Sequence, residues 1–324
     1  MNKILILGIN SFSGSTLASF LQKKNTFKLY GTYNSKKNKK YLLYDEKKLI
    51  LKKINNLNHK TLINFINKVK PNYIIDFASI CMVNESWAHR NYYMNVNYLS
   101  KKKLFYSLKN IFYLKKYIYI STPEIFGSNN KISENLKKYN PSTPYAESKL
   151  KAELLLENYF KKFNFPGIIC RFSNFYGPGQ PIYRLIPKVS MCLDNNQPFP
   201  IDGKGLSKRN FIYSDDFARG IYLTIKKGKA GKKYHFCSSK TISIMKTVKL
   251  ICRYKKKRFD TYIKSNKERK KKDKIYKLNN KMTAKNLNWF AKTPFEDGLK
   301  KTIKFYEKNY KSLKKENLVY KFIR

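Results

Sequence analysis

The chain has 324 residues, of which 42% are hydrophobic and 15% aromatic, so it can bury the cores of about two domains, and no apolar run approaches the roughly 20 residues that span a bilayer. The formal net charge is +49, but only nine of the 69 basic residues are Arg and the lysine excess extends over the whole length, which favours a solvated surface over a specific nucleic-acid partner. The five cysteines are scattered and form no Cys-x-x-Cys pair, which excludes an obvious zinc site or disulfide framework, predicts no bound metal and fits a reducing cytoplasm.

The chain opens with a pattern typical of dinucleotide binding. Residues 3–7 are apolar after the lysine, as expected of a buried parallel strand, and a glycine-bearing turn and a helical pattern follow. In that arrangement the helix N-terminus faces a pyrophosphate and glycine lets the backbone approach it. The middle glycine of the expected Gly-x-x-Gly-x-x-Gly is replaced by serine, which weakens the motif. The predicted cofactor-binding residues of this turn are Gly8, Ser11, Phe12, Ser13 and Gly14.

The second predicted strand, 27–33, ends just before Asn34. An Asp or Glu at that place would bind the ribose 2′-hydroxyl of NAD. Asn34 is neutral and is followed by Lys36 and Lys37, so a 2′-phosphate could be tolerated. The choice between NAD and NADP therefore stays open.

Further strands are predicted at 73–78, 117–121 and 167–171, with helices between them such as 94–108. Strands and helices that alternate at this rhythm predict an α/β fold with a doubly wound parallel sheet. The turn-rich stretch 172–180 indicates a change of domain, and a terminal helix is predicted over 289–310.

Tyr145 and Lys149 lie four residues apart in a predicted helix and therefore share one face. A phenol has an unperturbed pKa of about 10, and a nearby ammonium, together with a cationic nicotinamide ring, would lower it. Tyr145 could then take a proton from an alcohol while hydride leaves the same carbon. Since Tyr and Lys are both abundant here, the spacing alone is weak support.

Two polar residues follow the strand at 117–121. In a doubly wound sheet ligands bind beyond the carboxyl ends of the strands, so Thr122 and Glu124 would face the site. The hydroxyl could share a substrate alcohol with Tyr145, and the carboxylate could act as a general base on an acidified C–H. The alternative is a capped loop, because Ser, Thr, Pro and Glu all favour turns and helix starts. Arg184 and Arg209 flank predicted loops and are candidates for binding phosphates of a substrate.

In this order, the motifs at 8–14, 121–127, 145–149 and 171–178 resemble the extended short-chain dehydrogenase/reductase family, which comprises the NAD-dependent epimerases and dehydratases. The likeness covers nearly the whole chain and is strongest toward the nucleotide-sugar 4,6-dehydratases, with 185–187 and 209–216 especially like those that act on dTDP-glucose. The resemblance implies a Rossmann-type domain over 1–175, a smaller substrate-binding domain mainly over 176–310 with some segments returning to the Rossmann core, and a basic tail over 311–324. It also implies a homodimer.

The resemblance implies a role for each matching residue. Tyr145, with Lys149 and Thr122, would remove the proton of the sugar 4-hydroxyl as hydride passes to the cofactor. Glu124 would take the proton of carbon 5, water would leave from carbon 6, and hydride would return there. Further cofactor-binding residues, besides Tyr145 and Lys149, would be Asn34, Asn56, Ala78, Asn95 and Ser121, and the substrate-binding residues Asn174, Arg184, Arg209 and Arg269.

One position departs from the family pattern. Glucose dehydratases carry Asp before the Glu, where it protonates the leaving hydroxyl, and this chain has Pro123, which can donate nothing. Glu124 favours a dehydratase or a decarboxylase over a 4-epimerase, which needs no base at carbon 5. A 4-epimerase or a decarboxylase on the same scaffold is the runner-up. A non-catalytic basic protein that binds nucleic acid or a membrane surface ranks low.

Overall fold

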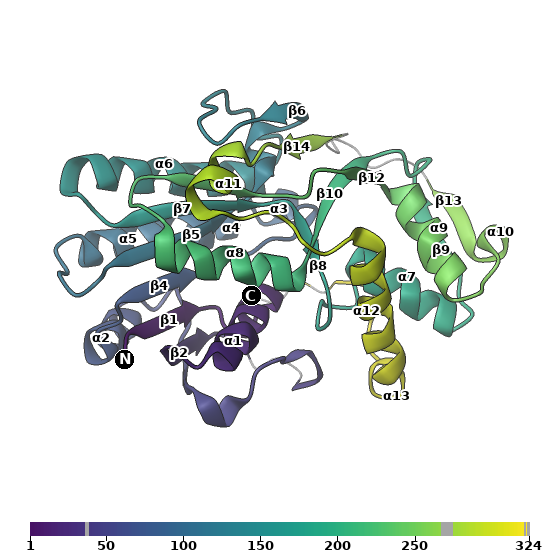
Figure 1. The fold of residues 1–324 in the computed structure, drawn as a ribbon, viewed down its shortest axis with the longest axis horizontal. Coiled ribbons are helices and arrows are strands. Elements are labelled where there is room, and N and C mark those ends of the chain that lie inside the picture. The colour runs from purple at the N-terminus through teal and green to yellow at the C-terminus, as the bar shows by residue number, and fades with distance from the viewer. Residues whose placement is uncertain (36–38, 267–274, 321, 323–324) are drawn as a thin grey trace.

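The computed structural model describes residues 1–35, 39–266, 275–320 and 322. Its centre is a seven-stranded parallel sheet with the strand order β11-β7-β5-β4-β1-β2-β3 (Figure 1). This sheet confirms the predicted doubly wound α/β fold. The order reverses between β1 and β4, the point at which such sheets bind ligands. The strands are β1 (Lys3–Leu7), β2 (Lys28–Tyr33), β3 (Ile50–Lys53), β4 (Tyr73–Asp76), β5 (Lys116–Ser121), β7 (Gly167–Phe172) and β11 (Lys233–Phe236).

Helices cover both faces of the sheet (Figure 1). Successive side chains of a strand point to opposite faces. Ile4 and Ile6 accordingly pack in one core with α1 (Phe12–Lys24) and α8 (Ser214–Lys227). Leu5 and Leu7 pack in another core, with residues of the helices on the opposite face. Those helices are α2 (His59–Val69), α5 (Ser100–Leu108) and α6 (Pro144–Phe163).

A second unit lies to one side of the sheet and has a hydrophobic core of its own (Figure 1). It contains α7 (Leu185–Asp194), β9 (Phe199–Asp202), α9 (Ile244–Tyr254), α10 (Phe259–Tyr262), β13 (Ile263–Asn266) and α12 (Phe295–Lys308). A three-stranded sheet joins the two units, and it consists of β8 (Asn174–Tyr176), β10 (Lys208–Tyr213) and β12 (Thr241–Ser243). Between these segments the chain returns to the large sheet as α8 and β11, and later as α11 (Lys281–Leu287).

The remaining elements are short. Among the described residues, no helix has both the length and the apolar character needed to cross a membrane. These elements are η1 (Lys39–Tyr41), η2 (Glu46–Lys48), α3 (Glu85–Ala88), α4 (Arg90–Met94), the π-helical turn η3 (Asn95–Leu99), η4 (Pro123–Phe126), β6 (Asn129–Ile132), β14 (Tyr276–Leu278) and α13 (Tyr310–Leu313).

The last part of the chain differs from the expectation. The predicted helix over 289–310 begins only at Phe295, because Pro294 precedes it in an extended conformation and disfavours helix in the residue before it. Trp289 lies ahead of this helix, fully buried, and its ring meets Phe236 edge to face. The expected basic tail is packed against the protein where the structure describes it. Leu313 is buried, and the Tyr41 hydroxyl donates a hydrogen bond to Glu316 at 2.6 Å.

Candidate active site

The glycine-bearing turn between β1 and α1 leaves room for glycine only. Gly8 has φ +75°, and a β-carbon there would lie 3.2 Å from the backbone nitrogen of Ala78. A β-carbon at Gly14 would lie 2.6 Å from the Gly8 carbonyl oxygen. Ser11, in contrast, has φ −66°, which any residue adopts, and its hydroxyl accepts a hydrogen bond from the Gly14 amide at 3.0 Å. The serine is therefore the N-cap of α1, and this position needs no glycine.

The first turn of α1 points its amides out of the helix at the carboxyl edge of the sheet. The amides of Phe12 and Ser13 have no partner within the helix, as at any helix N-terminus, and such amides bind phosphate groups. The Phe12 ring stacks on Phe175 of β8 at 4.5 Å, which fixes this turn against the strand that leads into the second unit.

Several buried oxygens on the same edge lack a hydrogen-bond partner among the described residues. Two of them are Asn56 Oδ1, after β3, and Ser121 Oγ, at the end of β5. Leaving such an atom unpaired costs about 1–3 kcal/mol, so each is a place where a bound ligand fits. Asn34 is exposed at the end of β2, and Lys36 and Lys37 lie outside the described residues. The turn, the helix N-terminus and these two oxygens fit a dinucleotide.

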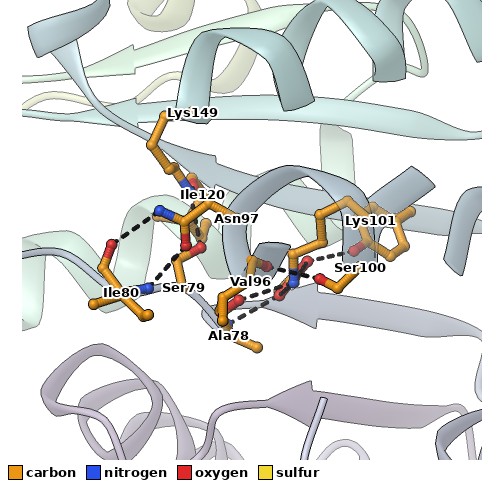
Figure 2. Close-up of polar contacts among 11 residues, drawn as sticks. Ala78, Ser79, Ile80, Val96, Asn97, Ser100, Lys101, Ile120 and Lys149 are labelled. Carbon is orange, nitrogen blue, oxygen red and sulfur yellow. Dashed lines mark hydrogen bonds and ion pairs between the residues drawn. The ribbon is translucent and has the colours of Figure 1, made fainter. Parts of the chain in front are cut away.

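The structure corrects the expected position of the inward-facing asparagine. Asn95 is exposed, whereas Asn97, two residues later in η3, is fully buried. Asn97 Oδ1 accepts from the Ile80 amide at 2.9 Å, and its Nδ2 donates to the Ile80 carbonyl and to Ser148 Oγ (Figure 2). Asn97 thereby ties the loop after β4 to α6. Asn97 has helical spacing to Lys101 and Leu108, which are buried on the same helical face, and this spacing could have predicted its burial from the sequence.

Lys149 lies beneath this loop on α6. Its Nζ donates to Ser79 Oγ at 3.0 Å and to the Ile120 carbonyl at 2.7 Å (Figure 2). Burial lowers the pKa of Lys149 to about 7, and the positive charge of Lys101 acts in the same direction. Both direct hydrogen-bond acceptors are neutral, so among the described residues no carboxylate in direct contact offsets the effect of burial on the pKa of Lys149.

Tyr145 is buried one turn before Lys149, in the first turn of α6, which Thr143 caps. Burial raises the pKa of Tyr145 well above its usual value, and the negative charge of Glu124 raises it further. A hydrogen bond with Thr122 opposes the increase. The sequence predicts a lowered pKa for Tyr145. The chain's own groups instead raise it.

Thr122 and Glu124 stand at the start of η4, directly after β5. The Thr122 hydroxyl accepts a hydrogen bond from the Glu124 amide at 3.3 Å and so caps the turn, with Pro123 in its first position. The capped turn that was the alternative interpretation is present, and it sets the positions of the Thr122 and Glu124 side chains. The hydroxyl and the carboxylate both act on the Tyr145 phenol. The structure therefore brings Thr122, Glu124 and Tyr145 together, and Lys149 lies one turn further along α6 with Ser79 and the Ile120 carbonyl as its partners.

A buried polar cluster that the sequence did not reveal supports η4. Arg171 of β7 donates from Nε to Glu153 at 3.0 Å, and its guanidinium lies 4.9 Å from the centre of the Phe126 ring, in η4. Burial and the Arg171 charge hold the pKa of His235 well below its usual value, so this neighbour stays neutral. A satisfied network of this kind fixes the turn that carries Glu124.

The predicted substrate residues fall into two places. The Arg209 guanidinium lies 4.6 Å from the centre of the Tyr276 ring, and the Tyr276 hydroxyl donates to Asn174 Oδ1 at 2.9 Å, so Tyr276 joins Arg209 to Asn174. Arg184, at the start of α7, donates to Cys81 Sγ at 3.1 Å. Tyr276 and Cys81 were not predicted, and Arg269 lies outside the described residues.

Residues 4–237 match the sequence model of the NAD dependent epimerase/dehydratase family. The match extends over more than half of the chain, and the protein belongs to this family. The resemblance expected from the motifs is thus confirmed.

Individual relatives agree with this assignment. The dTDP-D-glucose 4,6-dehydratase of Dictyostelium discoideum is 33% identical over 279 residues, which are 78% of this chain and 62% of that protein. The human dTDP-D-glucose 4,6-dehydratase is 31% identical over 207 residues, which are 62% of this chain and 59% of that protein. This chain thus spans about three fifths of these two relatives. A solved dTDP-glucose 4,6-dehydratase from Bacillus anthracis, in complex with NAD, has the same fold, with a TM-score of 0.87 at 24% identity over 96% of this chain and 98% of that one.

Proposed function

We propose that this protein is an NAD-dependent nucleotide-sugar 4,6-dehydratase. The observation that carries the proposal is that the capped turn with Thr122 and Glu124 packs against α6 at Tyr145, where Thr122 is hydrogen-bonded to the phenol and the Glu124 charge raises its pKa. A phenol beside a hydroxyl suits proton removal from an alcohol, and a carboxylate beside them suits proton removal from a neighbouring carbon. An enzyme that only oxidises and reduces one carbon has no use for the second base.

The cofactor is proposed to lie across the carboxyl edge of the sheet. Its pyrophosphate would face the first turn of α1, and its polar groups would meet the side chains on that edge. When bound, NAD would accept hydride from carbon 4 and return it to carbon 6, and its positive ring would oppose the raised pKa of Tyr145. The residues proposed to hold it are Gly8, Ser11, Phe12, Ser13, Gly14, Asn34, Asn56, Ala78, Asn97 and Ser121.

The chain's own residues would then move two protons. Tyr145, hydrogen-bonded to Thr122 and one helical turn before Lys149, takes the proton of the 4-hydroxyl. The ketone formed at carbon 4 acidifies the C–H at carbon 5, and Glu124 takes that proton. Water leaves from carbon 6. Pro123 cannot supply the proton of the leaving hydroxyl, so this proton comes from another group.

The nucleotide diphosphate is proposed to bind between the two units. Arg209 presents its guanidinium over the flat Tyr276 ring, and Asn174 adds an amide to the same cluster. Arg184 stands nearer the chemistry, because its charge acts on Tyr145. Guanidinium groups match the geometry of phosphate oxygens, which fits the two phosphates of a nucleotide sugar.

We also propose a homodimer in the cytoplasm. Large hydrophobic side chains are exposed on neighbouring helices: Tyr106 on α5, and Leu154 and Phe163 on α6. Two copies that share such a face would cover it. The five cysteines are all free thiols, as expected in a reducing compartment. Sedimentation of wild type and of a Tyr106→Glu, Leu154→Glu double variant would test the dimer, which the two charges should dissociate.

Deuterium incorporation tests the role of Glu124. In D₂O the wild type should form a 4-keto-6-deoxy product with deuterium at carbon 5, because the proton taken by Glu124 exchanges with solvent. Glu124→Gln should abolish the product while NADH absorbance still reports oxidation at carbon 4. Glu147→Gln is the control, since Glu147 is paired with Arg90 and Lys151 at the surface. Equal product from Glu124→Gln and wild type would refute the proposal.

A further inference from the structure

Residues 314–320 and Phe322, called here the crossing segment, are anchored firmly where the chain leaves α13. Leu313 is fully buried in a cluster with Tyr306 and Met191 of the second unit. Glu316 accepts the hydrogen bond of the Tyr41 hydroxyl, and burial with the Glu316 charge raises the pKa of Tyr41, so the phenol stays a donor. The segment therefore starts from a fixed position.

From this anchor the segment reaches the sheet-bearing unit through aromatic contacts. The Tyr320 ring meets Tyr183 edge to face at 5.0 Å. The Phe322 ring stacks on His89 at 3.9 Å and meets Tyr92 of α4 edge to face at 5.7 Å. Such ring pairs stabilise beyond their buried area, so several together can hold a short segment in place.

The contacts continue to the catalytic phenol. Phe322 also stacks on Tyr93 at 6.4 Å between ring centres, and Tyr93 meets Tyr145 edge to face at 6.5 Å. Tyr93 is fully buried, with its hydroxyl donated to the Met82 carbonyl. The segment therefore rests on the residue that backs Tyr145.

Tyr320 also shares electrostatic neighbours with the catalytic phenol. Burial raises the pKa of Tyr320 to about 12, with contributions from Tyr183, Cys81 and Glu85, and Arg184 opposes the increase. Cys81 and Arg184 act on Tyr145 as well. The geometry agrees, because Tyr183, which the Tyr320 ring contacts, lies under the Arg184 guanidinium at 5.7 Å, and Arg184 donates to Cys81. The Tyr320 hydroxyl stays protonated at neutral pH, where it can donate a hydrogen bond.

We propose that the crossing segment covers the sugar end of the substrate site, with Tyr320 as a residue that binds the hexose and Phe322 as the residue that holds the cover on α4. The identity of the ligand rests on the proposed function. A cover here excludes water from the carbons that react, and it must open for substrate exchange. Neither residue matches any motif of the sequence.

Binding measurements test the role of Tyr320 and Phe322. Calorimetric titration with dTDP-glucose should show about tenfold weaker binding for Tyr320→Ala and for Phe322→Ala, whereas dTDP, which lacks the hexose, should bind within about twofold of wild type. Tyr320→Phe should separate the hydroxyl from the ring. Val319→Ala is the matched control, because Val319 is 63% exposed in the same segment. Equal losses for both ligands, or no loss for either, would overturn the assignment.

A second measurement needs no nucleotide. Lys314 and Lys315 are exposed trypsin sites in the same segment. Phe322→Ala should raise the rate of tryptic cleavage at these lysines severalfold over wild type and Val319→Ala, with the thermal midpoint unchanged. Equal rates would refute the cover. If wild type binds neither dTDP nor dTDP-glucose, the proposed function fails, and the cleavage rates still decide the cover.

Discussion

Two buried lysines, Lys101 and Lys149, lie beside the same loop but differ in their partners (Figure 2). Lys101 Nζ is 2.8 Å from Asp76 Oδ2, and both side chains are almost fully buried. Lys149 donates its hydrogen bonds to a hydroxyl and a carbonyl, and burial lowers its pKa to about 7. Lys101 thus has a carboxylate in direct contact, whereas the acceptors that the structure describes for Lys149 are neutral and its pKa is lowered. The second environment is the one expected of a functional lysine.

The largest expected effect is a loss of stability when the Lys101–Asp76 ion pair is removed. Lys101→Met leaves the Asp76 carboxylate buried without its cation and should lower the free energy of unfolding by about 3–5 kcal/mol. Lys149→Met removes a buried cation that has no direct carboxylate partner and should leave stability at pH 7 unchanged or higher. Urea unfolding of both variants makes the comparison. Equal losses would show that the two lysines do not differ as described.

The second prediction concerns turnover. Lys149→Met should lower kcat by about 100-fold or more, because the ammonium no longer favours the Tyr145 phenolate. Lys116→Met is the control, since Lys116 also donates to backbone carbonyls, those of Thr224 and Ile225, but begins β5 at the opposite end of the sheet. Turnover of a nucleotide-hexose, measured for both variants, should fall only for Lys149→Met. A comparable decrease in the Lys116 variant would contradict a specific role for Lys149.

The third and smallest effect is a dependence of stability on pH. The folded pKa of Lys149 is about 7, below the ordinary value of 10.5, so between these values the unfolded chain binds more protons. The Lys149 contribution to stability is therefore complete above the ordinary value and is lost as the pH falls toward 7. Its slope is at most about 1.4 kcal/mol per pH unit. Unfolding of wild type and Lys149→Met between pH 7 and 9, at about half-unit steps, should show a steeper increase for wild type. Parallel curves would mean that the pKa is not lowered.

The grouping of the proposed catalytic residues could be predicted where local order defines it. Tyr145 and Lys149 share a helix turn, and Thr122 and Glu124 follow a strand whose apolar residues mark its end. Ser11 was treated as a weakness of the glycine motif, although a serine with negative φ can cap the helix. These features depend on neighbours within a few residues.

The other parts of the site depend on tertiary contacts that local patterns do not encode. In the π-helical turn the buried asparagine is Asn97, whereas the resemblance pointed to Asn95. Arg184 and Cys81 are 103 residues apart, and Tyr276 and Asn174 are 102 apart, so no motif links them. The path of residues 314–320 and the place of Phe322 depend on contacts with Tyr41, Tyr183 and α4, which the description of 311–324 as a basic tail does not contain.

The central claim is the reaction itself, and mass spectrometry tests it most directly. The purified protein would be incubated with NAD and a panel of nucleotide-hexoses that includes dTDP-glucose, UDP-glucose and a nucleotide uronic acid. The account predicts a product lighter by one water, absent with Glu124→Gln. An unchanged mass with a new stereoisomer, or loss of carbon dioxide from the uronic acid, would contradict it and assign the site to an epimerase or a decarboxylase.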